Sequence, residues 1–231
     1  MVSRAADVVL ELQRGRLLLL QGDGRGAARA LAECGARITV AVDSDATIAA
    51  LRRAWLEHLV IFFRDQELPP AQFLSFARRF GEVERIFLTH YAHPGYPEIM
   101  FVSNIKENGR DIGHADAGRV WHTDMSYTAR PPRATMLYAR EVPVDNGVTL
   151  GDTLFSSAAD AHDALPPETQ ERIAKLRAIH QVAGRRARTG TGQEDQALRY
   201  QQPAVVHPVV RTHPYTGRKC LYVSKGECEG I

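Results

Sequence analysis

The sequence is poor in the features that mark disulfide-rich, zinc-binding or membrane-spanning proteins. It has three cysteines, Cys34, Cys220 and Cys228, and no CxxC pair. This excludes a disulfide framework and a thiolate zinc site, and it indicates reduced thiols. No apolar run approaches the roughly 20 residues of a membrane span, and the run LLLL at 17–20 is too short for a signal peptide. We therefore expect a cytoplasmic protein without a membrane partner.

The sequence also lacks a large excess of either charge. Its 29 basic and 27 acidic residues leave a net charge of +2, so the balance does not indicate a nucleic-acid partner. The arginine cluster at Arg185, Arg186 and Arg188 is local and is typical of a solvated loop. The hydrophobic fraction of 44% is ordinary for a globular protein, and 231 residues suffice for one sizeable core.

Hydrophobic periodicity predicts short strands mixed with a few helices. The expected helices are 46–59, 69–81, 153–165 and 166–180, and the expected strands are 60–63, 97–104, 120–127, 134–142, 204–213 and 219–224. Strands and helices do not alternate regularly after residue 60. The pattern therefore predicts a mainly β protein, with an antiparallel core and helices packed outside it.

Two HxD patterns are candidates for a metal site. His114 and Asp116 lie between glycines, where nothing fixes their side chains in register. His122 and Asp124 lie in VWHTDMSY, which has the composition of a strand, and side chains at i and i+2 of a strand share one face. From their spacing alone, His122 and Asp124 are either two ligands of one metal ion or a polar pair on a solvated strand.

The residue types favour iron if a metal is bound. An imidazole and a carboxylate without a nearby thiolate suit the 2-His-1-carboxylate arrangement of non-haem Fe(II) enzymes, which needs a second, distant histidine. The downstream candidates are His162, His180, His207 and His213. Each also has a structural explanation, such as a solvated helix face for His162 and a helix C-terminus for His180.

Four blocks of the sequence resemble one known family. They are FFRDQELPPAQFLSFARRFGEVE, WHTDMSYTARPPRATMLYAREVP, GDTLFSSAADAHDALP and VVHPVVRTHPYTGRKCLYVS, and together they extend over roughly residues 35–225. In this order they are similar to the taurine dioxygenase-like family of Fe(II)- and 2-oxoglutarate-dependent oxygenases.

The resemblance implies a double-stranded β-helix, or jelly-roll, fold. It implies that His122 and Asp124 are iron ligands and that Thr153, at an expected helix start, binds the far carboxylate of 2-oxoglutarate. Thr149 is the rival for that role. The implied reaction consumes 2-oxoglutarate and O2, releases succinate and carbon dioxide, and hydroxylates a small organic acid such as a carboxylate, sulfonate or sulfate ester.

The sequence departs from the family pattern at its end. The family's distal iron-binding histidine and its 2-oxoglutarate arginine lie beyond the LYV strand, whereas this sequence stops at Ile231. We therefore expect a jelly-roll domain over 35–231 that lacks its last strands, with activity impaired unless another chain completes the site. A homo-oligomer is compatible with this. The alternative is a non-catalytic, truncated remnant.

The first 34 residues are expected to be an N-terminal segment without an assigned role. Gly22, Gly24, Gly26 and Ala27 resemble a shortened dinucleotide-binding turn of the short-chain dehydrogenases. Further βα units do not follow, so a dehydrogenase-like nucleotide-binding fragment is the least favoured hypothesis.

Overall fold

The computed structural model describes residues 2–3, 8–12, 44–63, 66–115, 117–118, 120–182 and 201–231. The predicted boundary between residues 34 and 35 lies outside these ranges. So does the glycine-rich turn at 22–27. Both stay predictions.

Short antiparallel strands dominate the described chain. The strands are β1 (Val2–Ser3), β2 (Val8–Leu12), β3 (Val60–Phe63), β4 (Ala92–His93), β5 (Tyr96–Met100), β6 (Lys106–Glu107), β7 (Arg110–Asp111), β8 (Ala134–Tyr138), β9 (Val142–Asp145), β10 (Val148–Thr149), β11 (Arg177–His180), β12 (Val205–Pro208), β13 (Val210–Thr212), β14 (Lys219–Leu221) and β15 (Cys228–Gly230). The helices are α2 (Asp45–His58), α3 (Pro70–Arg78), α4 (Ala158–Asp163) and α5 (Pro167–Ile173), with a 3₁₀ turn at Thr89–Tyr91. The prediction of a mainly β protein with flanking helices is confirmed.

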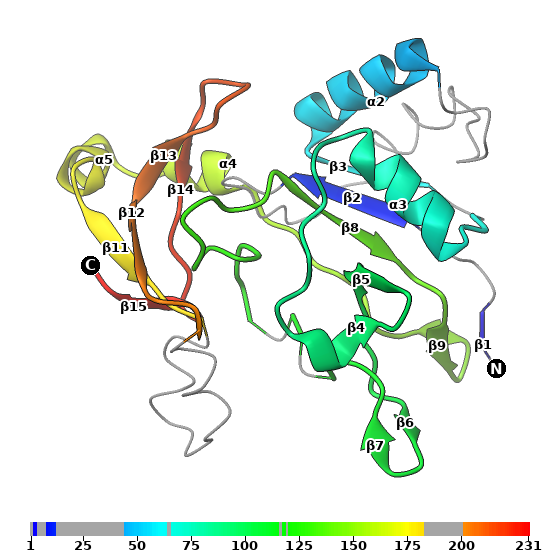
Figure 1. Ribbon diagram of the computed structural model, residues 1–231. Helices are drawn as coiled ribbons and strands as arrows, with labels where there is room; N and C mark the ends of the chain where they lie inside the picture. The colour runs from blue at the N-terminus through cyan, green and yellow to red at the C-terminus, as the bar shows by residue number, and fades with distance from the viewer. Residues whose placement is uncertain are drawn as a thin grey trace.

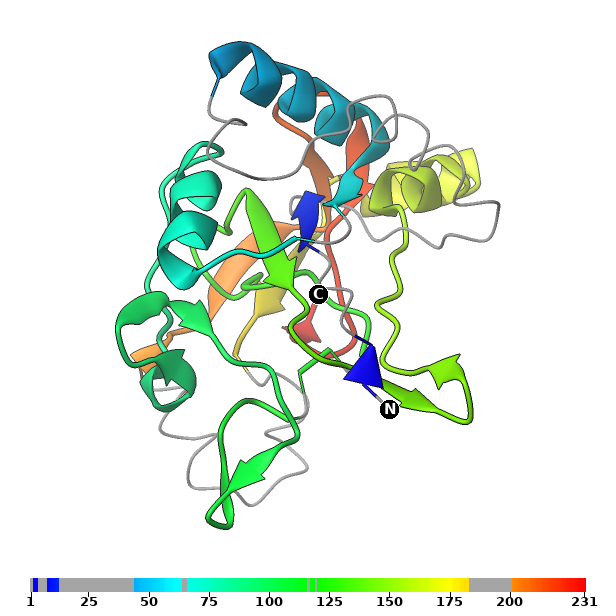
Figure 2. The ribbon, with the colours of Figure 1, turned by 90° about the vertical axis from the view of Figure 1, so that its right-hand side faces the viewer.

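One sheet has the order β3-β2-β8 and lies beside the two longest helices (Figure 1). Leu10 of β2 is opposite Ile61 of β3 on one side and opposite Met136 of β8 on the other. Part of the predicted N-terminal segment therefore pairs with strands of the predicted oxygenase domain. Both views place α2 next to β2 and β3 (Figures 1 and 2).

Local sequence explains where α2 begins and ends. The side chain of Ser44 accepts a hydrogen bond from the backbone N–H of Thr47 over 3.2 Å, which caps the first turn. Leu59 adopts a left-handed conformation with φ of 73° and donates its N–H to the carbonyl of Trp55, so the helix stops there. The apolar side chains at helical spacing face inward, as predicted for 46–59.

The main hydrophobic core lies between this sheet and its helices. Its buried members are Ile48, Leu51, Trp55, Leu59, Ile61, Phe63, Leu68, Phe76 and Phe80. Phe80 meets Trp55 edge-on at 5.8 Å and Phe76 at 5.2 Å between ring centroids, which is the geometry that aromatic pairs prefer. Phe76 of α3 and Phe80, just after that helix, are therefore part of the core.

A second group of strands follows later in the chain. β11 lies between β12 and β15 in one sheet, and β13 pairs with β14 in another. In Figure 1 these strands lie beside α4 and α5, away from β2 and β3. Residues of β11 alternate between exposed and buried, and Ala178 and His180 point inward.

Several predicted elements differ from the structure, and one of them, the strand predicted at 204–213, is two strands, β12 and β13. The helix predicted at 166–180 ends at Ile173, and Arg177–His180 form β11 because they pair with β12 and β15. The strand predicted at 134–142 is two strands, β8 and β9. The helix predicted from Thr153 begins at Ala158, because the side chain of Ser157 accepts the N–H of Asp160 over 3.0 Å and caps it there.

Candidate metal and 2-oxoglutarate site

The segment that carries His122 and Asp124 is a turn, so the prediction of a strand at 120–127 is wrong. The N–H of Ser126 donates to the carbonyl of Thr123 over 3.3 Å, and that of Thr128 donates to the carbonyl of Met125 over 3.0 Å. Met125 has a φ of 52°, which is incompatible with an extended strand. We call residues 120–128 the site turn.

The site turn nevertheless brings the two predicted ligands together. Nε2 of His122 lies 2.8 Å from Oδ1 of Asp124. Their side chains are 29% and 36% exposed, so the pair is open to solvent and a cation can reach it. The convergence predicted from i, i+2 spacing is present, although a turn produces it.

Each member of the pair is held at its other polar atom. Nδ1 of His122 donates to the carbonyl of Val120 over 2.7 Å, while the hydroxyl of Thr135 in β8 donates to Oδ2 of Asp124 over 2.8 Å. Supports of this kind orient metal-binding histidines and carboxylates. A proton on Nδ1 leaves Nε2 as the nitrogen that can bind a metal.

The pair is electrostatically coupled. The hydrogen bond to Asp124 raises the pKa of the His122 imidazole from 6.5 to about 9, while burial acts in the opposite direction. His122 is therefore positively charged at neutral pH when it faces Asp124 alone. A divalent cation bound between the two would displace the proton on Nε2.

The donor atoms fit an iron ion as two neighbouring ligands. Ligands about 2.1 Å from a metal at adjacent octahedral positions lie about 3 Å apart, close to the observed separation of Nε2 and Oδ1. Among the residues that the structure describes, no group of three or more His, Cys, Asp or Glu side chains gathers at one point. His122 and Asp124 are thus the two candidate ligands that the described residues bring together at this place.

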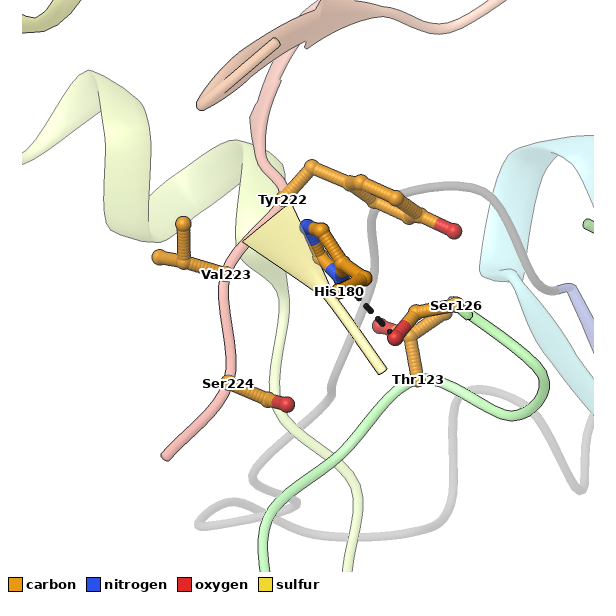
Figure 3. A pocket seen from close by; sticks show the side chains of 6 residues that line it. All are labelled: Thr123, Ser126, His180, Tyr222, Val223 and Ser224. Atoms are coloured by element: carbon orange, nitrogen blue, oxygen red, sulfur yellow. Dashed lines mark hydrogen bonds between the residues drawn. The ribbon is translucent and has the colours of Figure 1, made fainter. Parts of the chain in front are cut away.

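Behind the site turn lies a small pocket (Figure 3). Its lining residues are Thr123, Ser126, His180, Tyr222, Val223 and Ser224. The hydroxyl of Ser126 lies 3.0 Å from Nδ1 of His180 and also donates to the carboxylate of Glu227. Sequence reasoning missed Ser126, Thr135 and Glu227, because serine, threonine and glutamate without a spacing pattern give no signal.

The four histidines considered as a third ligand lie apart from the pair. His162 was predicted on a solvated helix face, but in α4 it is buried, with 8% of its surface exposed. His180 ends β11 and not a helix. His207 lies 2.9 Å from the carbonyl of Thr128 through Nε2, and His213 accepts the N–H of Thr216 at Nδ1. His180 and His207 thus contact the site turn behind the ligand pair.

Thr153 does not start a helix. It is exposed in the coil between β10 and α4, and its rival Thr149 is in β10. The prediction that Thr153 binds an anion at a helix N-terminus is therefore wrong about the helix. The role of Thr153 in binding 2-oxoglutarate rests on the family resemblance. The other HxD pattern is described only at His114, whose ring lies 5.4 Å from that of Tyr91.

Comparisons with known proteins identify relatives along most of the chain. Residues 27–229 match the family described as taurine catabolism dioxygenase TauD, TfdA family. The chain is 34% identical to pentalenolactone F synthase of Streptomyces arenae, over 85% of the chain and 69% of that protein. It is 33% identical to the alpha-ketoglutarate-dependent 2,4-dichlorophenoxyacetate dioxygenase of Cupriavidus pinatubonensis, over 76% of the chain and 63% of that protein.

A solved structure supports the fold. A crystal structure of a candidate alpha-ketoglutarate-dependent taurine dioxygenase from Burkholderia xenovorans superposes with a TM-score of 0.58 and 23% identity. The match includes 84% of this chain and 59% of that one. The chain thus shares the fold of these enzymes, the jelly-roll that the resemblance implies. The predicted absence of the last strands stays a prediction.

The described residues show no sign of a membrane span. None of their helices combines the length and the apolar character that crossing a bilayer requires.

Proposed function

The chain belongs to the TauD, TfdA family, and on that premise we propose that it is an Fe(II)- and 2-oxoglutarate-dependent dioxygenase of a small organic acid. One observation carries the proposal: Nε2 of His122 and Oδ1 of Asp124 lie 2.8 Å apart in the turn that bears the family's HxD pattern. The cofactors of this reaction are Fe(II), 2-oxoglutarate and O2.

In this proposal each residue of the site has a separate role in binding the metal. His122 and Asp124 hold the metal, Thr135 fixes the second oxygen of Asp124, and the carbonyl of Val120 keeps the proton of His122 on Nδ1. When bound, iron with 2-oxoglutarate and O2 supplies the oxidising power, which hydroxylates the substrate while 2-oxoglutarate becomes succinate and carbon dioxide.

The substrate is an anionic small molecule in this proposal. The relative from Cupriavidus pinatubonensis is named for a substrate that carries a carboxylate. Carboxylates, sulfonates and sulfate esters all present oxygen atoms of similar charge, and the described residues do not select among them. A cytoplasmic location and a homo-oligomeric state belong to the same proposal.

Turnover tests the proposal directly. The protein is incubated with Fe(II), 2-oxoglutarate and ascorbate under air, and succinate and oxygen consumption are measured with a panel of small carboxylates and sulfonates. We expect succinate in proportion to the oxygen consumed, and its loss in both His122→Ala and Asp124→Ala. His58→Ala, on α2, is the matched control. Equal succinate formation in all variants would refute the assignment.

A second candidate function follows from the count of ligands. Only two protein ligands meet among the described residues, which favours a protein that binds a divalent ion without turnover. Metal binding that depends on His122 and Asp124, together with absent succinate formation over the whole panel, would select this candidate.

A further inference from the structure

Ser126 occupies an unusual place for a serine. It lies two residues after Asp124 and is 2% exposed, so water does not compete for its hydroxyl. The hydroxyl donates its proton to Oε2 of Glu227. At 3.0 Å it accepts from Nδ1 of His180, as Figure 3 shows. One buried hydroxyl thus joins the site turn to two residues that are far away in sequence.

The two partners of Ser126 are fixed to each other without it. His180 ends β11 and Glu227 precedes β15, and these two strands pair. The N–H of Gln181 donates to the carbonyl of Glu227 over 3.0 Å, and the N–H of Glu227 donates to the hydroxyl of Ser224 over 3.3 Å. His180 and Glu227 therefore form a frame, and the site turn is the part that this frame holds.

The frame holds the site turn close to its two ligands. Thr135 anchors Asp124, His207 contacts the carbonyl of Thr128, and Ser126 is the anchor between them. Loss of the Ser126 hydroxyl removes one hydrogen-bond partner from the buried imidazole of His180 and one from the half-buried carboxylate of Glu227, and the loss of such shielded hydrogen bonds is costly. Because β11 and β15 are held by their own pairing, we expect the site turn to be the part that shifts.

We propose that Ser126 is a positioning residue, which holds the site turn against His180 and Glu227 so that His122 and Asp124 converge on one metal ion. This inference rests on the proposed function. Ser126 acts through the turn and contacts neither the metal nor the substrate. The segment from Ser224 to Gly230 thereby becomes part of the support of the site.

The test compares Ser126→Ala with the conservative Ser126→Thr, which keeps the hydroxyl, and with Ser157→Ala as the matched control. Ser157 is also a buried serine, but its hydroxyl caps α4. Two quantities are measured on the full chain: affinity for Co(II), followed by its visible absorption, and backbone amide exchange of residues 122–128 without metal. A loss of buried hydrogen bonds predicts a roughly tenfold weaker affinity and roughly tenfold faster exchange in Ser126→Ala.

The outcomes separate this inference from the proposed function. Ser126→Thr should retain most of the affinity, and Ser157→Ala should change neither quantity. Wild-type affinity and wild-type exchange in Ser126→Ala would overturn the inference. If the wild-type chain binds no Co(II), the proposed function fails, while the exchange of the metal-free turn still decides the role of Ser126. If Ser126→Ala does not fold, Ser126→Cys, similar in volume but a weaker donor, should show the same changes to a smaller degree, and no change there overturns the inference.

Discussion

Thr135 donates its hydroxyl to Oδ2 of Asp124 over 2.8 Å, so a residue of β8 fixes the carboxylate that faces His122. The contact joins the sheet that contains the main core to the site turn. A distortion of β8 would therefore reach the candidate metal site through the side chain of Thr135.

Replacing Thr135 with valine should weaken metal binding while the fold is retained. Valine has nearly the same shape but cannot donate to Asp124, and loss of such a support commonly costs about 10- to 100-fold in metal affinity. The measurement is a Co(II) titration. Thr212→Val, in the short strand β13, is the control and should bind as the wild type does. An unchanged affinity in Thr135→Val would show that the contact has no part in binding.

Thr153 and Thr149 can be separated by 2-oxoglutarate binding. The family resemblance assigns the far carboxylate to Thr153, so Thr153→Ala should weaken 2-oxoglutarate binding to the Co(II)-loaded protein about tenfold, as expected for a hydrogen bond to a charged group. Thr149→Ala should leave it unchanged. The emission of Trp121, which precedes His122 and is 46% exposed, offers a signal for the titration. The reverse result would assign the role to Thr149.

Acid should destabilise the protein through His180. This side chain is 1% exposed, and burial, together with the nearby His207 and Arg211, lowers its pKa from 6.5 to about 4. Between these values the unfolded chain binds a proton that the folded chain does not, so the free energy of unfolding falls as the pH falls below about 6.5. From pH 7.5 to pH 5 the loss from this one group is roughly 2 kcal/mol.

Urea unfolding at the two pH values measures this dependence. In His180→Gln the difference between pH 7.5 and pH 5 should shrink. His122 affects stability over a different pH range. Because its pKa is raised in the folded chain, the protonated imidazole adds to the free energy of unfolding below pH 6.5, and this contribution is lost as the pH rises through about 9. An equal pH dependence in wild type and His180→Gln would contradict the burial of a neutral imidazole.

The core beneath α2 should be sensitive to truncation. Leu51 is 2% exposed among the aromatic and aliphatic side chains of the main core. Leu51→Ala should lower the free energy of unfolding by about 2–5 kcal/mol, because it removes buried methyl groups and leaves a cavity. Arg53→Ala, on the exposed side of the same helix, should change it by less than about 0.5 kcal/mol. Denaturant unfolding checks both values.

Elements with a strong local signal were predictable from the sequence. Helix α2 has apolar residues at helical spacing and a serine that caps its start, so its bounds follow from near neighbours. Residues 177–180 were predicted as the end of a helix because a short apolar run does not distinguish helix from strand. These residues form a strand because they pair with β12 and β15, which are distant in sequence.

The candidate site was predictable only in part. The spacing of His122 and Asp124 identified the pair, although the expected strand is a turn. Thr135 and Ser126 support the pair through contacts with residues 11 and 101 positions away, namely Asp124 and Glu227. Such contacts arise when strands come together, and neither residue type nor spacing indicates them.

The most direct measurement is the binding of Co(II) to the wild type, His122→Ala and Asp124→Ala, with the unfolding midpoint recorded for each. The account predicts one ion per wild-type chain and at least about 100-fold weaker binding in both variants, because removal of a ligand costs more than the roughly 10- to 100-fold cost of losing a residue that supports one, while all three chains remain folded. Undiminished binding in both folded variants would contradict the claim that this imidazole and this carboxylate share a metal ion.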